Sequence, residues 1–226
     1  MRDARTLTPD EAAAVYDRVG RAQDTQAFYE TPAIDLLIEH GAFSAASAIL
    51  EVGCGTGRVA ERLLRDECSP ETRYVGVDVS ARMVQLARSR LSVYAERAAV
   101  EQTDGTFAFD LPSQSQDRVV ATYVLDLLAP DAIRALLDEA HRLLRDHGQL
   151  CLAGLTWGRR PLGRLISGFW AVAHRVRPEW VGGCRPLRMR RVLSEEQWCI
   201  AHHEQVQAWG VPSEVLIATP RSCTRL

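Results

Sequence analysis

The chain has 226 residues, of which 46% are hydrophobic and 25% charged, and this composition excludes a disordered or fibrous protein. The length suits one large domain or two small ones with a full hydrophobic core. The formal net charge of −2 hides an asymmetry. Residues 1–146 hold 16 arginines and 24 acidic residues, whereas residues 147–194 hold nine arginines and one acid.

Two helices are expected at the start of the chain. The first follows Thr8 and runs to about Val19, because Thr8 is a suitable N-cap, a proline follows it and Glu11 completes a capping box. A second start at Thr31-Pro32 leads into a helix over residues 33–40.

Short apolar strands and helices then alternate. This alternation is typical of βαβ units in a parallel sheet, and near-continuous apolar strands indicate that helices cover both faces. The expected strands are Ala48–Val52, Tyr74–Val77, Ala99–Thr103, Arg118–Val124 and Gln149–Leu155, and the expected helices are Arg58–Arg65, Ala81–Leu91 and Pro130–Arg145.

The chain ends differently. Trp198–Gln207 and Glu214–Thr219 are expected strands joined through Gly210-Val211-Pro212, with no room for a helix between them. They therefore form a hairpin, and the final strand is antiparallel to its neighbour. The predicted fold class is α/β, with a doubly wound, mostly parallel seven-stranded sheet, an antiparallel last strand and helices on both faces.

The cysteines give no sign of an oxidising compartment. All six are scattered and none forms a C-x-x-C pair, and no basic and then apolar stretch opens the sequence. No apolar run reaches the roughly 18 residues that a membrane span needs. These features predict a reduced, cytoplasmic protein.

A glycine-rich turn follows the first strand. Gly53-Cys54-Gly55-Thr56-Gly57 lies at the carboxyl end of that strand, where ligands bind in open α/β sheets. Glycines alone would also fit a tight packing turn. Asp78, however, ends the second strand 21 residues after Gly57, where a carboxylate can accept both hydroxyls of a ribose. Together these features predict a nucleoside cofactor.

Two residues distinguish between nucleoside cofactors. The dinucleotide fingerprint G-x-G-x-x-G needs glycine at the position of Arg58. Glu51, two residues before the first glycine, would repel a pyrophosphate but not a cationic amino-acid moiety. The turn therefore favours a ligand with a ribose, an ammonium group and no phosphate.

With these motifs the sequence resembles the class I S-adenosylmethionine (SAM) dependent methyltransferases, of the type that acts on small molecules or lipids. The likeness is close over residues 45–156 and extends to the terminal hairpin. The segments that carry it are Glu51–Gly57, Val75–Met83, Thr103-Asp104-Gly105, Asp117–Leu128 and His141–Leu150.

The resemblance implies roles for the matching residues. Gly53 and Gly55 would pass close to the methionine part of SAM, and Glu51 would orient its amino group directly or through water. Asp78 would hold the ribose, and Met83 would flank the adenine unless it only packs in the core. The other implied cofactor-binding residues are Cys54, Val79, Asp104 as acceptor from the adenine amino group, Gly105, Tyr123 and Tyr16.

The resemblance also implies a single methyltransferase domain, 1–226, in four parts. These are an N-terminal helical lid segment (1–44), a SAM-binding core (45–156), an insertion that caps the substrate (157–196) and the terminal hairpin (197–226). For the lid segment, which holds Tyr16 and Tyr29, ordinary packing on the sheet is an equal alternative.

Methyl transfer from a sulfonium needs alignment more than catalytic groups, so no triad is required. A general base matters only for an acceptor that must lose a proton. Asp126, at the end of the fourth strand, and Tyr29 are the catalytic candidates, although Asp126 could equally cap the next helix. His202 and His203 are adjacent on a strand and face opposite sides, so no metal site is predicted.

The insertion carries a helical stripe of apolar residues from Leu162 to Val176, bordered by arginines. Such a helix can lie on a membrane or cover the active site with its apolar face inward, and the covering role is favoured. Trp170 and Arg185 are the substrate-binding candidates, Arg185 for an acceptor carboxylate or phosphate. The basic block, residues 147–194, either meets an anionic ligand or surface or pairs with the acidic part of the chain.

The predicted function is transfer of a methyl group from SAM to N, O or S of a small-molecule or lipid-like acceptor, in the cytoplasm, with a peripheral membrane contact through residues 160–177 kept open. The product of the cofactor would be S-adenosylhomocysteine. One alternative is a non-catalytic protein that binds SAM or S-adenosylhomocysteine and regulates a partner. Another is a nicotinamide-dependent oxidoreductase, against which Arg58 and Glu51 argue. Nucleic acid is disfavoured, because no N-P-P-Y/F-type tetrapeptide follows the fourth strand.

Overall fold

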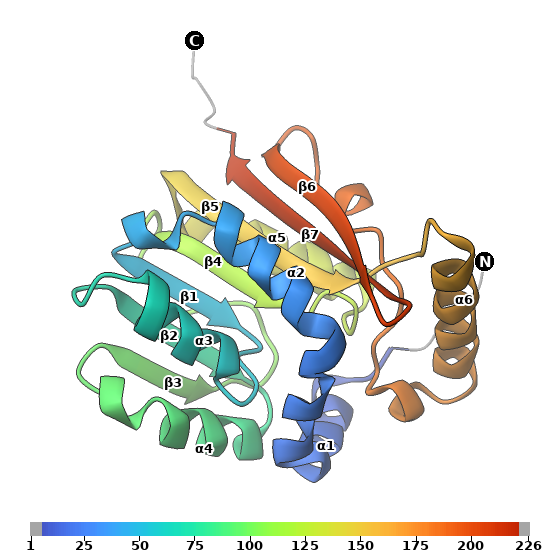
Figure 1. Ribbon diagram of the computed structural model, residues 1–226. Coiled ribbons are helices and arrows are strands. Elements are labelled where there is room, and N and C mark those ends of the chain that lie inside the picture. The colour runs from blue at the N-terminus through green and yellow to red at the C-terminus, as the bar shows by residue number, and fades with distance from the viewer. Residues whose placement is uncertain (1–5, 222–226) are drawn as a thin grey trace.

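A seven-stranded sheet forms the centre of the computed structural model, which describes residues 6–221 (Figure 1). The strand order is β3-β2-β1-β4-β5-β7-β6, and β7 is antiparallel to both of its neighbours. The predicted fold class is thereby confirmed. The strands are β1 (Ala48–Val52), β2 (Arg73–Asp78), β3 (Ala98–Gln102), β4 (Gln116–Thr122), β5 (Leu144–Leu155), β6 (Trp198–Ala208) and β7 (Val211–Pro220).

Helices cover both faces of the sheet and the edge at which the parallel strands end (Figure 1). The α-helices of the described chain are α1 (Pro9–Val19), α2 (Ala27–His40), α3 (Arg58–Arg62), α4 (Ala81–Arg90), α5 (Pro130–Leu143) and α6 (Pro161–Val176). Buried side chains of α2, α3 and α4 form one core against the sheet, and those of α5 form a second core on the opposite face. The first helix, α1, and α6 lie beyond the strand ends.

The first two helices show where local signals succeed and where they fail. α1 has the predicted capping box, in which the Thr8 hydroxyl accepts from the backbone of Glu11 and the Glu11 carboxylate accepts from the backbone of Thr8. The predicted start at Thr31-Pro32 is wrong, because α2 begins at Ala27 and contains the proline. A 3₁₀ segment, Gly20–Gln26, runs directly into α2 and adds a turn before the proline, whose missing N–H costs one hydrogen bond.

Most other boundaries lie close to the prediction. The helix after the glycine-rich turn is shorter, because α3 passes into a π turn at Leu63–Glu67. β5 begins earlier than Gln149, since Leu144 leaves α5 in extended conformation and pairs with Gln116 across an irregularity in β4.

α6 corrects the prediction that the apolar stripe of this helix faces inward. Ile166 and Trp170 pack inward, beside the buried small residues Gly163 and Ser167. A side chain at Gly163 would lie 2.5 Å from Gln207 Oε1, so the small residues let the helix approach β6. The helix has two apolar faces, and the one that carries the larger stripe is 56–75% exposed: Leu162, Leu165, Phe169, Val172 and Val176.

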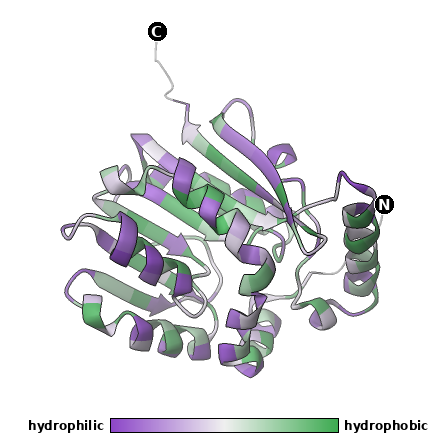
Figure 2. Ribbon diagram, in the orientation of Figure 1, coloured by the Kyte–Doolittle hydropathy of each residue, from purple (hydrophilic) through white to green (hydrophobic). Residues whose placement is uncertain are grey.

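The distribution of hydropathy follows the layers. Figure 2 shows hydrophobic strands in the centre and hydrophilic outer turns on the helices beside them, whereas α6 is hydrophobic along most of its length. Within residues 6–221, no helix has the length and hydropathy that a membrane-spanning segment requires.

Candidate functional site

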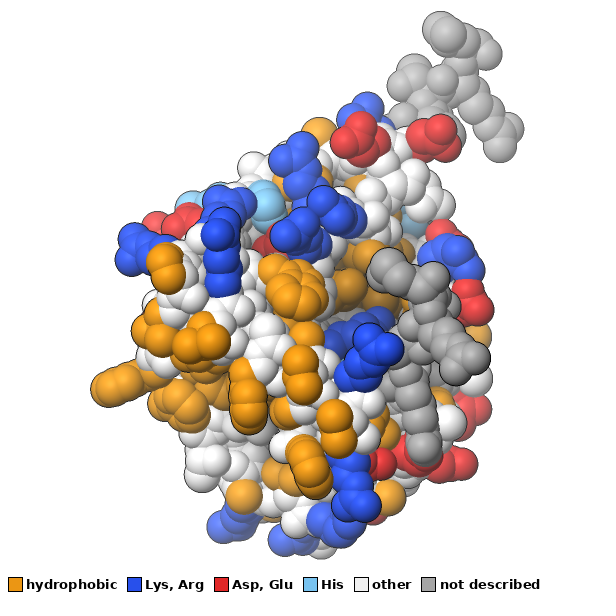
Figure 3. Space-filling view, turned by 90° about the vertical axis from the view of Figure 1, so that its right-hand side faces the viewer, with side chains coloured by type: hydrophobic (Ala, Val, Ile, Leu, Met, Phe, Trp, Pro, Cys, Tyr) orange, Lys and Arg blue, Asp and Glu red, His pale blue; other side chains and the backbone are white. Residues whose placement is uncertain are grey.

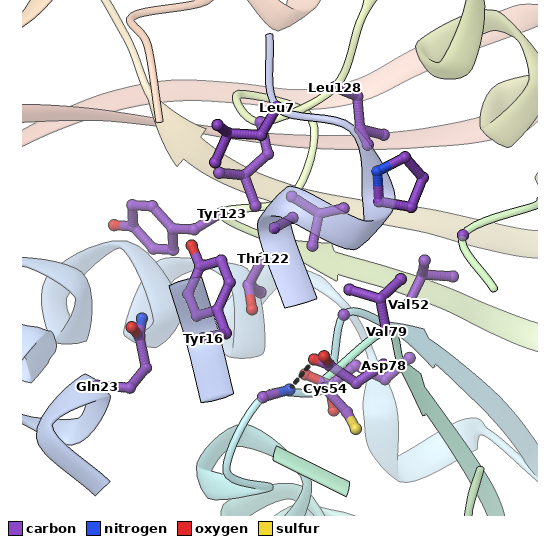
Figure 4. Close-up of a pocket in the computed structure, with 18 of the residues that line it drawn as sticks. Leu7, Tyr16, Gln23, Val52, Cys54, Asp78, Val79, Thr122, Tyr123 and Leu128 are labelled. Atoms are coloured by element: carbon purple, nitrogen blue, oxygen red, sulfur yellow. Dashed lines mark hydrogen bonds between the residues drawn. The ribbon is translucent and has the colours of Figure 1, made fainter. Parts of the chain in front are cut away.

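A cavity of about 410 Å³ lies where β1 and β2 end, and its volume is in the range of small-ligand sites. The glycine-rich turn forms one side, and α1 with the segment before it forms another. Figure 4 shows Tyr16 and Tyr123 on one side of the cavity and Asp78, Val79 and Cys54 on the other. Four segments that are distant in sequence therefore enclose one space at the predicted edge of the sheet.

The turn after β1 exposes bare backbone to the cavity. Gly53, Gly55 and Gly57 all have positive φ, at 68°, 54° and 77°, a conformation that glycine adopts without strain. A Cβ atom at Gly53 would lie 2.4 Å from Val124, so glycine is also required there by packing. At Gly55 nothing lies within 4 Å of such an atom, so this residue leaves open space beside the turn.

Asp78 connects the turn to β2 and α4. Its Oδ2 accepts from the backbone of Gly55 at 2.9 Å, and its Oδ1 accepts from the backbone of Ser80 at 2.9 Å. Burial raises the pKa of this carboxyl above its ordinary value. The predicted approach of Asp78 to the glycine-rich turn is therefore present, and the carboxylate lines the cavity.

Glu51 lines the cavity from β1 and is only 1% exposed. The hydroxyl of Tyr74 donates to its Oε2 at 2.6 Å. Burial raises the pKa of Glu51 to about 7, because the carboxylate is poorly solvated there. A cationic group in the cavity would stabilise the ionised form of Glu51.

The sequence reasoning missed two further acidic residues that line the cavity, Glu30 and Asp24. Glu30 lines the cavity and pairs with Arg58 at 2.6 Å, and burial raises the pKa of Glu30 to about 7. Asp24 lies nearby and accepts from Thr56 and Arg90, at 2.6 Å each. The misplaced helix start hid this signal, because it left Glu30 outside the helix that carries it to the cavity.

Most of the predicted cofactor-binding residues line the cavity, and two do not. Met83 is 1% exposed and does not line it, so the packing alternative describes its position. Asp104 is exposed and accepts from the backbone and hydroxyl of Thr106, so its carboxylate is held by its own loop. The predicted residues that do line the cavity are Glu51, Gly53, Cys54, Gly55, Asp78, Val79, Gly105, Tyr123 and Tyr16.

Tyr16 and Tyr123 form a largely apolar wall. The Tyr16 hydroxyl donates to the carbonyl of Gly182 at 3.3 Å, and the Tyr123 hydroxyl lies 2.9 Å from Ser213 Oγ. Burial raises the pKa of both phenols above the ordinary value. Both side chains are therefore neutral near pH 7 and can shape the cavity without acting as bases.

The two catalytic candidates lie behind this wall, outside the lining of the cavity. Asp126 is 1% exposed; its Oδ2 accepts from the backbone of Leu155 at 3.1 Å, and its Oδ1 has no partner among the described residues. Burial raises the pKa of Asp126 to about 7. Tyr29 donates to Gln26 at 2.8 Å and packs its ring edge against Tyr123. Their catalytic roles stay predictions.

The two substrate candidates also lie outside the lining. The Arg185 guanidinium donates to the carbonyl oxygens of Asp126 and Leu128, at 3.4 and 2.6 Å. Trp170 donates from its indole to the carbonyl of Cys184 at 3.1 Å. Arg185 thus holds the segment between β4 and α5 in place, and its recognition of an acceptor stays a prediction.

A histidine cluster lies apart from the cavity. His202 and His203 face opposite sides as predicted; His203 Nε2 is 2.5 Å from Glu214, whereas the ring of His202 stacks on that of His40 with centroids 3.7 Å apart. One ligand atom each from His40, His202 and Glu204 lie within 4.8 Å of one another, a spacing that could hold a metal ion. The sequence reasoning missed this group because His40 is remote in sequence.

Comparisons with known proteins agree with this geometry. A family model described as a methyltransferase domain matches residues 49–148. The tRNA N(3)-methylcytidine methyltransferase Mettl2 of Drosophila melanogaster is 30% identical over 141 residues, covering 61% of this chain and 43% of that protein. The non-reducing polyketide synthase dpmpA of Macrophomina phaseolina is 36% identical over 155 residues, covering 61% of this chain and 7% of the synthase. The chain thus spans less than half the length of these relatives.

A solved structure shares the fold over nearly the whole chain. The N-methyltransferase NodS from Bradyrhizobium japonicum WM9, in complex with S-adenosyl-L-homocysteine, superposes with a TM-score of 0.71 at 18% identity. The match covers 93% of this chain and 99% of that one. At this identity the likeness shows a common fold.

Proposed function

We propose that the chain is a class I SAM-dependent methyltransferase that transfers a methyl group from SAM to a nucleophilic atom of a small, largely apolar acceptor. The methyltransferase family model over residues 49–148 and the relatives named methyltransferases support this proposal. SAM is the cofactor of this family. When bound, it supplies an activated methyl group that needs only an incoming lone pair in line. The observation that carries the proposal is the contact between the bare backbone of Gly55 and the Asp78 carboxylate inside one cavity.

The lining of the cavity fits the polar ends of this cofactor. Asp78 can accept from ribose hydroxyls while it keeps its two backbone donors, because each carboxylate oxygen has two lone pairs. Glu51 is a buried carboxylate that ionises more readily beside a cation, as the amino group of the cofactor would be. The open space at Gly55 leaves room between them.

The acceptor side of the cavity favours a small apolar molecule. Leu7, Leu127 and Leu128 lie with Tyr16 and Tyr123 in the lining. Among the described lining residues, Arg58 is the one arginine, and it is paired with Glu30. A polyphosphate would therefore meet more acidic than basic groups there. The polyketide synthase relative supports a small-molecule acceptor.

RNA is a second candidate acceptor. Several curated relatives, from Drosophila melanogaster to Homo sapiens, are named tRNA methyltransferases, and residues 147–194 carry a net positive charge. Those arginines lie outside the lining of the cavity. An RNA acceptor would have to bind the surface and extend a base into the cavity.

Transfer of label from methyl-labelled SAM to fractions of a cell extract tests the proposal. We expect label in low-mass compounds that partition into organic solvent. Label confined to RNA would replace the small acceptor with the second candidate. Tight binding of SAM with no transfer to any fraction would contradict catalysis and favour a regulatory binding protein.

A further inference from the structure

The outer face of α6 is an apolar surface without a partner in the described chain. We define the α6 outer face as Leu162, Leu165, Phe169, Val172 and Val176, which are 56%, 72%, 75%, 61% and 64% exposed. Their alternating spacing of three and four residues places them along one side of the helix. Figure 3 shows hydrophobic side chains gathered over this side of the molecule, with arginines around them.

Two exposed tryptophans extend this surface. Trp209 is 81% exposed in the β6–β7 turn, and the following Gly210 packs against Leu162 and Ile166 of α6. Trp180 is 66% exposed just beyond the end of α6, and the guanidinium of Arg177 lies 5.7 Å from the centre of its ring. Tryptophan is favoured where one side of a ring is apolar and the other is wet.

Arginine dominates the charge around the α6 outer face, and the one acidic residue beside it is the exposed Glu179, next to Trp180. Residues 159–177 contain five arginines and no acidic residue. All five are exposed, and within residues 6–221 none of them makes an ion pair: Arg159, Arg160, Arg164, Arg175 and Arg177. Their positive charge is therefore available to a partner that is anionic.

We propose that the α6 outer face docks on the surface of an anionic lipid bilayer. A helix with leucine and phenylalanine on one face and arginine on its flanks can bury the apolar face at the boundary of headgroups and acyl chains. The arginines then meet anionic headgroups, which attract their positive charge. An anionic bilayer would therefore bury the apolar side chains and pair with the arginines at the same time.

Two other partners fit less well. A second copy packed against the same stripe would bring arginines of like charge together with no acidic residue on either helix to offset them. RNA would neutralise the arginines but would leave the five apolar side chains of the stripe unburied. The lipid surface alone uses both the stripe and its charged margin.

Docking at this face would lie close to the cavity. The inner side of α6 carries Trp170, whose ring packs edge-on with that of Tyr29, with ring centroids 6.3 Å apart. The ring of Tyr29 packs in the same way with that of Tyr123 in the cavity wall, with centroids 5.8 Å apart. Two aromatic contacts thus connect the docked helix to the cavity. Docking itself requires neither SAM nor methyl transfer.

Flotation with lipid vesicles tests this proposal in the absence of SAM. We expect the full chain to float with vesicles of phosphatidylglycerol and phosphatidylcholine at low salt, and not with phosphatidylcholine alone. The double variant Leu165→Ser/Phe169→Ser should bind at least tenfold more weakly. Val93→Ser is the matched control, because Val93 is 80% exposed outside α6, and it should bind like the unaltered chain.

The arginines are tested separately with Arg164→Gln/Arg175→Gln, which should weaken flotation and reduce its dependence on salt. Stabilisation by SAM in a thermal melt shows that each variant is folded, so a failure of docking is distinct from a failure of the proposed function. No flotation with the anionic vesicles, or an equal loss in Val93→Ser, overturns the proposal. If the chain does not float and instead forms a dimer that Leu165→Ser/Phe169→Ser converts to a monomer, the partner of the α6 outer face is a second copy. If the chain does not float and instead binds RNA, with the same variant binding RNA equally well, the lipid proposal is also overturned.

Discussion

Asp78 has a structural contact as well as a free face toward the cavity. Its two oxygens fix the backbone of Gly55 and Ser80, so the carboxylate holds the turn and the start of α4 at a constant distance. Because Asp78 is buried and its pKa is raised, its ionised form needs further donors. Ribose hydroxyls would supply such donors.

Replacement of Asp78 by Asn should weaken SAM binding by roughly 10- to 100-fold, since a hydrogen bond to a charged group contributes about 1.5–3 kcal/mol. Asn keeps one acceptor oxygen, so it can retain one of the two backbone contacts to Gly55 and Ser80 but loses the other, and a thermal melt without ligand measures the cost to folding. Isothermal titration calorimetry measures the affinity. Asp66→Asn is the control, because Asp66 is exposed and pairs with its neighbour Arg65. An affinity for SAM that Asp78→Asn leaves unchanged would refute the ribose role.

Glu51 gives SAM binding a pH dependence. Its pKa is about 7 before SAM binds, so Glu51 takes up a proton as the pH falls from 8 to 6. Because only the carboxylate attracts the ammonium group, the dissociation constant of SAM should rise about tenfold over that interval. Titration calorimetry at several pH values measures it.

Glu51→Gln should remove most of this pH dependence, and Glu30→Gln serves as the control. Glu30 has a similar pKa but is held by Arg58. If the pH dependence of the SAM dissociation constant vanished in Glu30→Gln and persisted in Glu51→Gln, Glu30 and not Glu51 would bind the ammonium group.

At the scale of elements, α1 closes the cavity by two attachments to the core. Asp17 Oδ1 accepts from the Ser80 hydroxyl at 2.6 Å and from the backbone of Arg82 at 3.1 Å, which ties α1 to the start of α4. At the other end of α1, Pro9 packs against Gly105. A Cβ atom added at Gly105 would lie 2.6 Å from the Cβ atom of Pro9. The position of Tyr16 in the cavity therefore depends on how well α1 is held.

The capping box of α1 supplies a test. Thr8→Ala removes the side-chain oxygen that accepts from Glu11, and it should lower the free energy of unfolding by about 1 kcal/mol. Affinity for SAM should fall as well, because Thr8 and Tyr16 line the cavity. Chemical denaturation measures the first effect and calorimetry the second. Thr8→Ser keeps the hydroxyl and should restore both; a Ser variant as impaired as Ala would contradict the capping role.

Elements with strong local signals could be predicted from the sequence. The Thr8 cap lies where the pattern placed it, and β1 has the predicted bounds. α2 could not be placed, since its first turn continues a 3₁₀ segment that has no sequence signal of its own. The orientation of α6 was also beyond reach, because periodicity describes a stripe but does not say which of two apolar faces packs inward.

The site divides in the same way. The cluster of Gly55, Asp78 and Glu51 follows from the order of strand, turn and strand, which topology brings to one edge. The positions of Glu30 and of the wall formed by Tyr16 and Tyr123 depend on how helices remote in sequence pack against the sheet. No local sequence pattern encodes that packing. Asp126 ends up behind the wall for the same reason.

For the whole molecule, three buried carboxyls make stability depend on pH. The pKa values of Glu30, Glu51 and Asp126 are each raised to about 7, so the folded chain binds more protons than the unfolded chain between their ordinary pKa values and 7. The free energy of unfolding therefore loses this contribution as the pH rises through 7.

Asp126→Asn should isolate one part of this effect. Asn can still accept from the backbone of Leu155 but cannot ionise, so the variant should lose less free energy of unfolding between pH 6 and 8 than the unaltered chain. Denaturant titrations at the two pH values measure the difference. Parallel losses in both proteins would show that Asp126 does not titrate in this range.

Charge is also segregated in the folded molecule. Of the nine arginines in residues 147–194, the eight other than Arg185 make no ion pair within the described part of the chain. The basic block therefore does not neutralise the acidic residues of the core by direct pairing. Figure 3 shows arginines around the hydrophobic side chains on the side of the molecule that carries the α6 outer face.

The most direct measurement is a crystal structure with S-adenosylhomocysteine. We predict its ribose hydroxyls within hydrogen-bond distance of Asp78, its amino group toward Glu51 and its amino-acid part over Gly53 and Gly55. A cavity that stays empty at saturating ligand, or a ligand bound away from the ends of β1 and β2, would contradict the assignment.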